Sequence, residues 1–260
     1  MRGILFRDSI MRRIVLGAAL LLLPPFASAE SRVWKLADGR TFEAEFMALV
    51  AGKVALKNRQ GKQIQISLKE FSEEDLKFIQ LSMPPRLEIS FSKKTNRRVY
   101  IPDLFYNNIE PTCFDYTFGA SVRQTSSGRY NHELQVEFFA IGTEIHGDRY
   151  ILLDRQAQGF TPTKENNRST EFKGKTVSLT DFIIKKGNDN QGTLRQEHRG
   201  RKYSSYLVVV TDSRGKIIAH ETPKKWLFEN YENLKQIPVG KYFDKTCTRV
   251  GPTRPKTLFY

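Results

Sequence analysis

The feature that most constrains the fold is an alternation of apolar and polar residues, interrupted by glycine-containing turns. It is clearest in "RVWKLADGRTFEAEF", residues 32–46. Phe42, Ala44 and Phe46 alternate there with two glutamates, which is the period-2 pattern of a half-buried strand. The preceding Asp38-Gly39 pair favours a tight turn, because both residues tolerate positive φ. This part of the chain is therefore predicted to form a β-hairpin.

The alternation continues through two more strands and then changes to a helical pattern. The further strands lie in "GKVALKNRQGKQIQISL", residues 52–68. Ser72 follows as a predicted N-cap, and Glu73-Glu74-Asp75 place acids in the first helical turn, where they favour the helix dipole. The helix is expected to end before Pro84-Pro85. Residues 30–82 are thus predicted to form four short strands closed by a helix.

Residues 30–82 resemble the SHD-one family, the first homology domain of the yeast endocytic adaptor Sla-one. The resemblance is carried by "RVWKLADGRTFEAEF", "GKVALKNRQGKQIQISL" and "LKEFSEEDLKFI". It implies an SH3-like small barrel that binds a short peptide containing Asn-Pro-Phe and a downstream Asp, without a catalytic role. Similar domains also occur in exported proteins of some bacteria. The resemblance therefore implies a protein or peptide ligand as the partner.

Trp34 and Arg40 are the candidate peptide contacts in this first module. A partly exposed tryptophan supplies contact area, and a nearby arginine can pair with a carboxylate or stack on a ring. The alternative is that Trp34 belongs to the core of the module.

Residues 1–29 have the layout of a secretory signal peptide. Arg12-Arg13 precede an apolar run at residues 14–23, and Ala27-Ser28-Ala29 form a small-x-small cleavage site. As a helix this run rises only about 15 Å, against about 30 Å for a bilayer core. We therefore expect an exported protein, periplasmic or extracellular, with no membrane span after cleavage; the alternative is an uncleaved anchor.

Residues 83–85 form a predicted proline linker, and residues 86–260 are predicted to be a β-sandwich with one late helix. Many short alternating segments separated by glycine-containing turns favour a sandwich. The helix is expected in "KKWLFENYENLKQI", which has helical spacing of its apolar residues. These apolar residues are Trp226, Leu227, Tyr231 and Leu234. The predicted fold class is mainly β throughout, a small SH3-like barrel followed by this sandwich.

The formal net charge of +14 lies mostly in the second domain. A basic domain attracts anionic partners, and the densest basic and aromatic segment is "RGRKYSSY" with the arginine upstream of it. The candidate anion-binding residues are Arg195, Arg199, Arg201, Lys202 and Tyr203. In an exported protein the anionic partner could equally be an acidic glycan or a lipid headgroup, and no nucleic acid is expected. The alternative is charge spread over a solvated surface.

The sequence contains no recognisable catalytic or cofactor-binding motif, and no cofactor or metal is expected. Asp115 and Asp154 lie in or beside predicted strands, and they could in principle serve glycan hydrolysis, but strand-edge carboxylates are the plainer interpretation. Cys113 and Cys247 could form one disulfide in an oxidising compartment; the alternative is two buried free thiols.

Together these observations predict an exported, non-catalytic, adaptor-type protein of the cell envelope that binds a protein or peptide. Two alternatives stay open. One is an envelope enzyme such as a glycan hydrolase, and the other is a binder of anionic polymers through the basic second domain.

Overall fold

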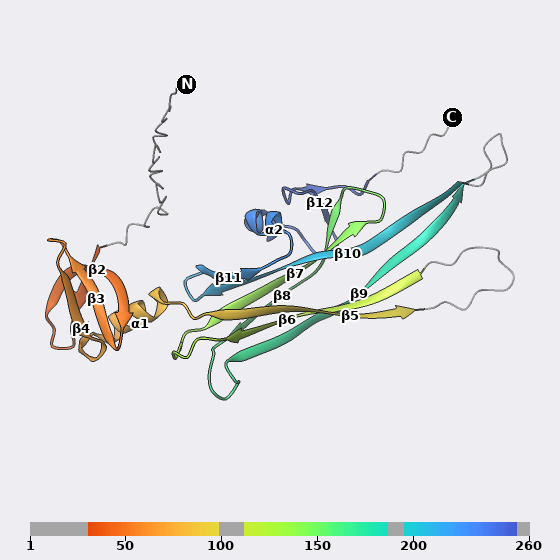
Figure 1. The fold of residues 1–260 in the computed structure, drawn as a ribbon. Coiled ribbons are helices and arrows are strands. Elements are labelled where there is room, and N and C mark those ends of the chain that lie inside the picture. Colours follow the sequence, from red (N-terminus) through yellow and green to blue (C-terminus); the bar gives the residue numbers. More distant parts are fainter. Residues whose placement is uncertain (1–30, 99–111, 187–194, 254–260) are drawn as a thin grey trace, which may run out of the picture. The chain divides into compact units, whose positions relative to one another are not determined.

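A computed structural model describes residues 31–98, 112–186 and 195–253 (Figure 1). The predicted signal peptide, residues 1–29, lies outside these ranges. The fold is mainly β, as predicted. The chain divides into two compact units, Met1–Ile79 and Gln80–Tyr260. None of the helices in the described ranges is long and apolar enough to cross a membrane.

The first unit is an antiparallel four-stranded sheet in the order β1-β2-β3-β4, followed by one 3-10 turn and one helix. Its elements are β1 Ser31–Lys35, β2 Thr41–Val50, β3 Lys53–Asn58, β4 Gln63–Ser67, η1 Leu68–Glu70 and α1 Glu73–Ser82. The segment after β4 returns to the end of β1. The Ser72 N–H donates to the Lys35 carbonyl at 3.0 Å, and Leu36 and Phe71 form an isolated bridge. These contacts roll the sheet into the small closed unit that the alternation predicted.

The first two of the three hairpin turns in the first unit differ from each other. Ala51 and Gly52 both have positive φ, +52° and +78°, as a two-residue turn that suits the strand twist requires. At the first hairpin only Gly39 has a positive φ, +87°. The Leu36 N–H donates to the Arg40 carbonyl at 2.9 Å and closes this turn. This is a three-residue loop that ends in a left-handed glycine. The tight turn predicted at Asp38-Gly39 is therefore present, with a three-residue loop in place of a two-residue one and positive φ at Gly39 alone.

The second unit contains a nine-stranded sheet in the order β13-β12-β8-β7-β10-β9-β6-β5, with β11 pairing β10 beside this path. Its strands are β5 Leu87–Arg98, β6 Thr112–Gln124, β7 Leu134–Glu144, β8 Tyr150–Phe160, β9 Ser169–Lys186, β10 Arg195–Asp212, β11 Ile217–Glu221, β12 Tyr242–Phe243 and β13 Arg249–Val250. The long strand β10 pairs with β9 along residues 195–200 and with β7 along residues 201–212. One strand thus belongs to two layers, as Figure 1 shows where β10 runs from β7 and β8 towards β9.

The two layers pack face to face over the main core, which is the feature expected of a β-sandwich. Phe118 of β6 and Phe138 of β7 both lie in this core, and Phe91 of β5 contacts Phe138 with ring centroids 5.9 Å apart. The sandwich prediction is therefore right about the layers. It missed the shared strand, because pairing between distant segments leaves no local pattern.

The predicted late helix is two short helices, α2 Lys225–Glu229 and α3 Tyr231–Leu234, separated by Asn230. Leu227, Tyr231 and Leu234 are buried in a second core on the outer side of β7, β8 and β10. The predicted apolar face is therefore right, although the helix is interrupted.

Candidate functional site

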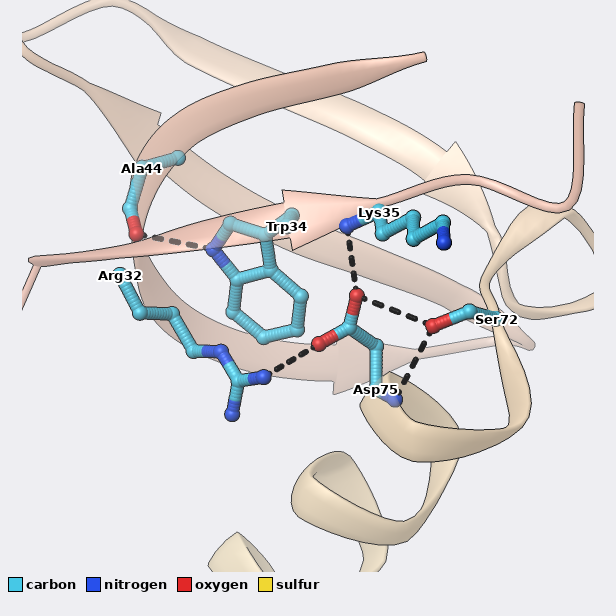
Figure 2. Close-up of polar contacts among 6 residues, drawn as sticks. All are labelled: Arg32, Trp34, Lys35, Ala44, Ser72 and Asp75. Atoms are coloured by element: carbon cyan, nitrogen blue, oxygen red, sulfur yellow. Dashed lines mark hydrogen bonds and ion pairs between the residues drawn. The ribbon is translucent and has the colours of Figure 1, made fainter. Parts of the chain in front are cut away.

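Trp34 is buried in the core of the first unit, and Figure 2 shows its indole nitrogen directed at the carbonyl of Ala44. Its side chain is 0% exposed, and its ring lies 5.5 Å from that of Phe71 and 5.6 Å from that of Phe78. The indole Nε1–H donates to the Ala44 carbonyl at 2.8 Å. The candidate peptide contact at Trp34 is thus corrected: a wholly buried ring has no surface to offer a ligand.

Arg32, and not Arg40, is the arginine that meets Trp34. Residues i and i+2 of a strand point to one face, so Arg32 of β1 lies beside Trp34. Its guanidinium carbon is 5.1 Å from the Trp34 ring centroid and 4.1 Å from that of Phe78. Arg40 directly follows the hairpin loop and pairs with Asp38 at 2.7 Å, largely exposed. A peptide contact by Arg40 stays a prediction, but it is separate from Trp34.

Asp75 ties the start of α1 to β1 (Figure 2). This carboxylate is only 2% exposed; Oδ1 accepts from Arg32 at 2.5 Å, and Oδ2 accepts from the Lys35 backbone N–H at 2.6 Å. The Asp75 N–H donates to Ser72 Oγ at 3.3 Å, so Ser72 is the N-cap that the sequence predicted. The cap was visible in the sequence, but the ion pair with Arg32 was not, because the two residues are 43 positions apart.

The edge of β1 that faces away from β2 has hydrogen-bonded backbone groups at Lys35 and, within the described ranges, unpaired backbone groups at Val33. At Lys35 the backbone N–H bonds Asp75 and the carbonyl bonds Ser72, so both groups point away from β2. Backbone groups two residues apart point the same way in a strand, so those of Val33 also face this edge. Among the described residues, no partner occupies the N–H or the carbonyl of Val33, and its side chain is 62% exposed.

The candidate anion-binding residues of the second unit separate on β10. Arg201 and Tyr203 share one face of the strand, while Lys202 lies between them and points to the other. Arg199 is half-buried and pairs across to β9. The side chain of Arg195 lies outside the described part of the chain. Arg201 and Tyr203 therefore lie on the same face of β10, and Lys202 lies on the other.

Asp115 and Asp154 do not form a facing pair of carboxylates. Asp115 lies on β6 and is bonded by Ser178 and Arg98, and these hydrogen bonds lower the pKa of its carboxyl group. Asp154 is buried among core side chains, where Gly174 leaves room for its Oδ2. In the ranges that the structure describes, no three His, Cys, Asp or Glu side chains gather as a metal site.

Cys113 and Cys247 are free thiols, so the disulfide considered from the sequence is not formed. Cys113 lies near the start of β6, beside Thr180 of β9, whereas Cys247 packs in the core beneath the two short helices. The thiols thus belong to different parts of the second unit.

We expect Cys247 to resist alkylation in the folded protein, even at pH 9. Burial and the nearby Asp244 carboxylate raise the pKa of this thiol to about 12, and only the thiolate reacts. Mass spectrometry after iodoacetamide treatment should show no modified Cys247 in native protein and two modified cysteines in urea, with or without prior reductant. Modification in urea that requires reductant would instead reveal a disulfide.

Comparison with protein families identifies the class of the first unit. Residues 25–84 match the family model of SLA1 homology domain 1, SHD1, which confirms the resemblance predicted for this segment. SHD1 is a protein-binding domain, so the chain carries a binding module.

Whole-chain comparisons add little to this assignment. No curated protein matches the chain. A crystal structure of a protein from Akkermansia muciniphila is 14% identical, with a TM-score of 0.23, and the match covers 60% of this chain and 78% of that one.

Proposed function

We propose that the protein is an exported, non-catalytic, adaptor-type protein of the cell envelope whose SHD1 domain captures an extended peptide of a partner protein. The single observation that supports this mode of binding is the edge of β1 at Val33, where the backbone N–H and carbonyl are unpaired within the described part of the chain and the side chain is exposed. The protein-binding class of the domain supports the kind of ligand, and the signal-peptide pattern of residues 1–29 supports export.

A peptide can bind an exposed sheet edge by adding a strand to it. The Val33 N–H and carbonyl would supply the main-chain hydrogen bonds, and its exposed side chain would supply an apolar contact. Lys35, two residues further along β1, is exposed on the same face. Its ammonium group could pair with an acidic residue of the peptide, which agrees with the Asp in the peptides that the family resemblance implies.

Changing Val33 should weaken peptide binding, whereas changing Val50 should not. Both valines are 62% exposed in the first unit, so Val50→Lys is a matched control for Val33→Lys. Val33→Pro removes the N–H that points away from β2. Proline is tolerated at such a position, because the missing N–H of an edge strand breaks no hydrogen bond within the sheet. We expect either Val33 variant to lower affinity about ten-fold, the loss of roughly 1.4 kcal/mol of binding free energy.

The probe is a library of unstructured peptides that includes Asn-Pro-Phe sequences followed by Asp, with the protein lacking residues 1–29 as bait. Affinity for a retained peptide is then measured by fluorescence polarisation for each variant. Retention of no peptide above background would contradict peptide capture. Equal losses in the Val33 and Val50 variants would contradict the β1 edge as the site.

A further inference from the structure

A surface of the second unit combines cationic and aromatic side chains from four strands. We call it the cationic–aromatic surface, and it consists of Lys93 of β5, Tyr116 of β6, Arg201 and Tyr203 of β10, and Tyr242 of β12. Lys93 Nζ lies 4.6 Å from the Tyr203 ring centroid and 5.7 Å from that of Tyr116. The Arg201 guanidinium carbon lies 5.6 Å from the Tyr242 ring centroid. The residues come together only in the folded sheet.

The two cations of this surface are exposed and lack carboxylate partners. No salt bridge to Lys93 or Arg201 forms within the described ranges. Glu144 is directly opposite Arg201 on β7, but its carboxylate accepts the Thr253 N–H at 2.9 Å instead. Both positive charges are therefore available to an anion from solvent.

The aromatic rings of this surface are already stacked and only partly exposed. The Phe118 ring lies 5.8 Å from that of Tyr116 and 5.5 Å from that of Tyr203, both stacked. Stacking of nucleobases needs open ring faces, which these tyrosines lack. A tyrosine hydroxyl is ordinarily protonated at physiological pH, and burial with Tyr206 close by raises the pKa of Tyr203 further, to about 12; this hydroxyl is therefore neutral and can donate a hydrogen bond. Neutral hydroxyls beside unpaired cations suit a ligand rich in both hydroxyls and anionic groups.

We propose that the cationic–aromatic surface binds an acidic polysaccharide. Its carboxylates pair with Lys93 and Arg201, and its hydroxyls bond with the tyrosine hydroxyls. This site belongs to the second unit and does not depend on peptide capture by the SHD1 domain.

The chain provides matched controls for both cations. Lys94 follows Lys93 and Lys202 follows Arg201, and successive residues of a strand point to opposite faces. All four side chains are exposed. The double variant Lys93→Gln/Arg201→Gln and the control Lys94→Gln/Lys202→Gln therefore change the net charge equally but remove cations from different faces.

Binding is measured at low salt by isothermal titration calorimetry. The probe is polygalacturonate, and neutral dextran and duplex DNA are the comparison ligands. We expect the Lys93/Arg201 variant to bind polygalacturonate about ten-fold more weakly than the unchanged protein, the loss of two partly exposed ionic contacts. The control should bind nearly as well as the unchanged protein, and affinity should fall as salt rises.

Three outcomes would overturn the proposal. They are an equal loss in both double variants, which would indicate bulk charge; tighter binding to DNA than to polygalacturonate; and no measurable binding to polygalacturonate at low salt.

Discussion

Replacing Trp34 with alanine is expected to unfold the first unit and leave the second unit folded. The side chain is 0% exposed and contacts the rings of Phe46, Phe71 and Phe78. Its removal leaves a cavity and also leaves the Ala44 carbonyl without its donor. Such changes cost about 3–5 kcal/mol. A unit of this size holds only about 3–7 kcal/mol of stability, at about 0.05–0.15 kcal/mol per residue.

Hydrogen exchange followed by mass spectrometry measures this directly, because it reports each unit separately. Peptides from residues 31–79 should lose protection in Trp34→Ala, while those from β7 and β10 should keep it. Val50→Ala, at an exposed position of the same unit, should change stability by less than about 0.5 kcal/mol. Retained protection of the first unit in Trp34→Ala would contradict the assignment of Trp34 to the core of this unit.

Replacing Asp75 with asparagine is expected to destabilise the first unit by about 3 kcal/mol, near the lower end for breaking a buried ion pair. The lower end applies because Arg32 is 27% exposed and can recover part of its hydration. The asparagine has nearly the same shape, but it carries no charge for Arg32. One of its terminal groups also becomes a donor, facing either Arg32 or the Lys35 N–H.

The urea midpoint of the first-unit transition measures this loss. Asp38→Asn is the control, because Asp38 and Arg40 form an exposed pair in the same unit, and it should shift the midpoint far less. Ser72→Ala should cost about 1 kcal/mol, the usual value of an N-cap. Similar shifts for Asp75→Asn and Asp38→Asn would show that the buried network does not stabilise the unit.

Much of the fold was predictable because its strands and caps leave local patterns. The alternation at Phe42, Ala44 and Phe46 places these residues on the inner side of β2, where Ala44 is buried in the core of the first unit and the two phenylalanines pack against it. The cap at Ser72 was correctly predicted from three following acids. The break between α2 and α3 at Asn230 has no comparably clear signal in the sequence.

The candidate sites were less predictable, because they depend on which strands pair and where a sheet ends. Arg40 was named beside Trp34 and Arg32 was not considered, although the i and i+2 spacing of a strand could have indicated Arg32. Val33 becomes a candidate only once β1 is known to be an edge strand. Lys93 was not among the candidate site residues, since nothing near it in the sequence predicts its contact with Tyr203.

The sequence by itself determined the mainly β class, the SHD1 character of the first unit, and the apolar faces of its strands and late helices. These follow from periodicity, turn residues and caps, which act over a few neighbouring positions. The tertiary structure alone decided that Trp34 is buried, that Asp75 pairs with Arg32, and that β10 joins two layers. These depend on contacts between residues far apart in the chain, which no local pattern specifies.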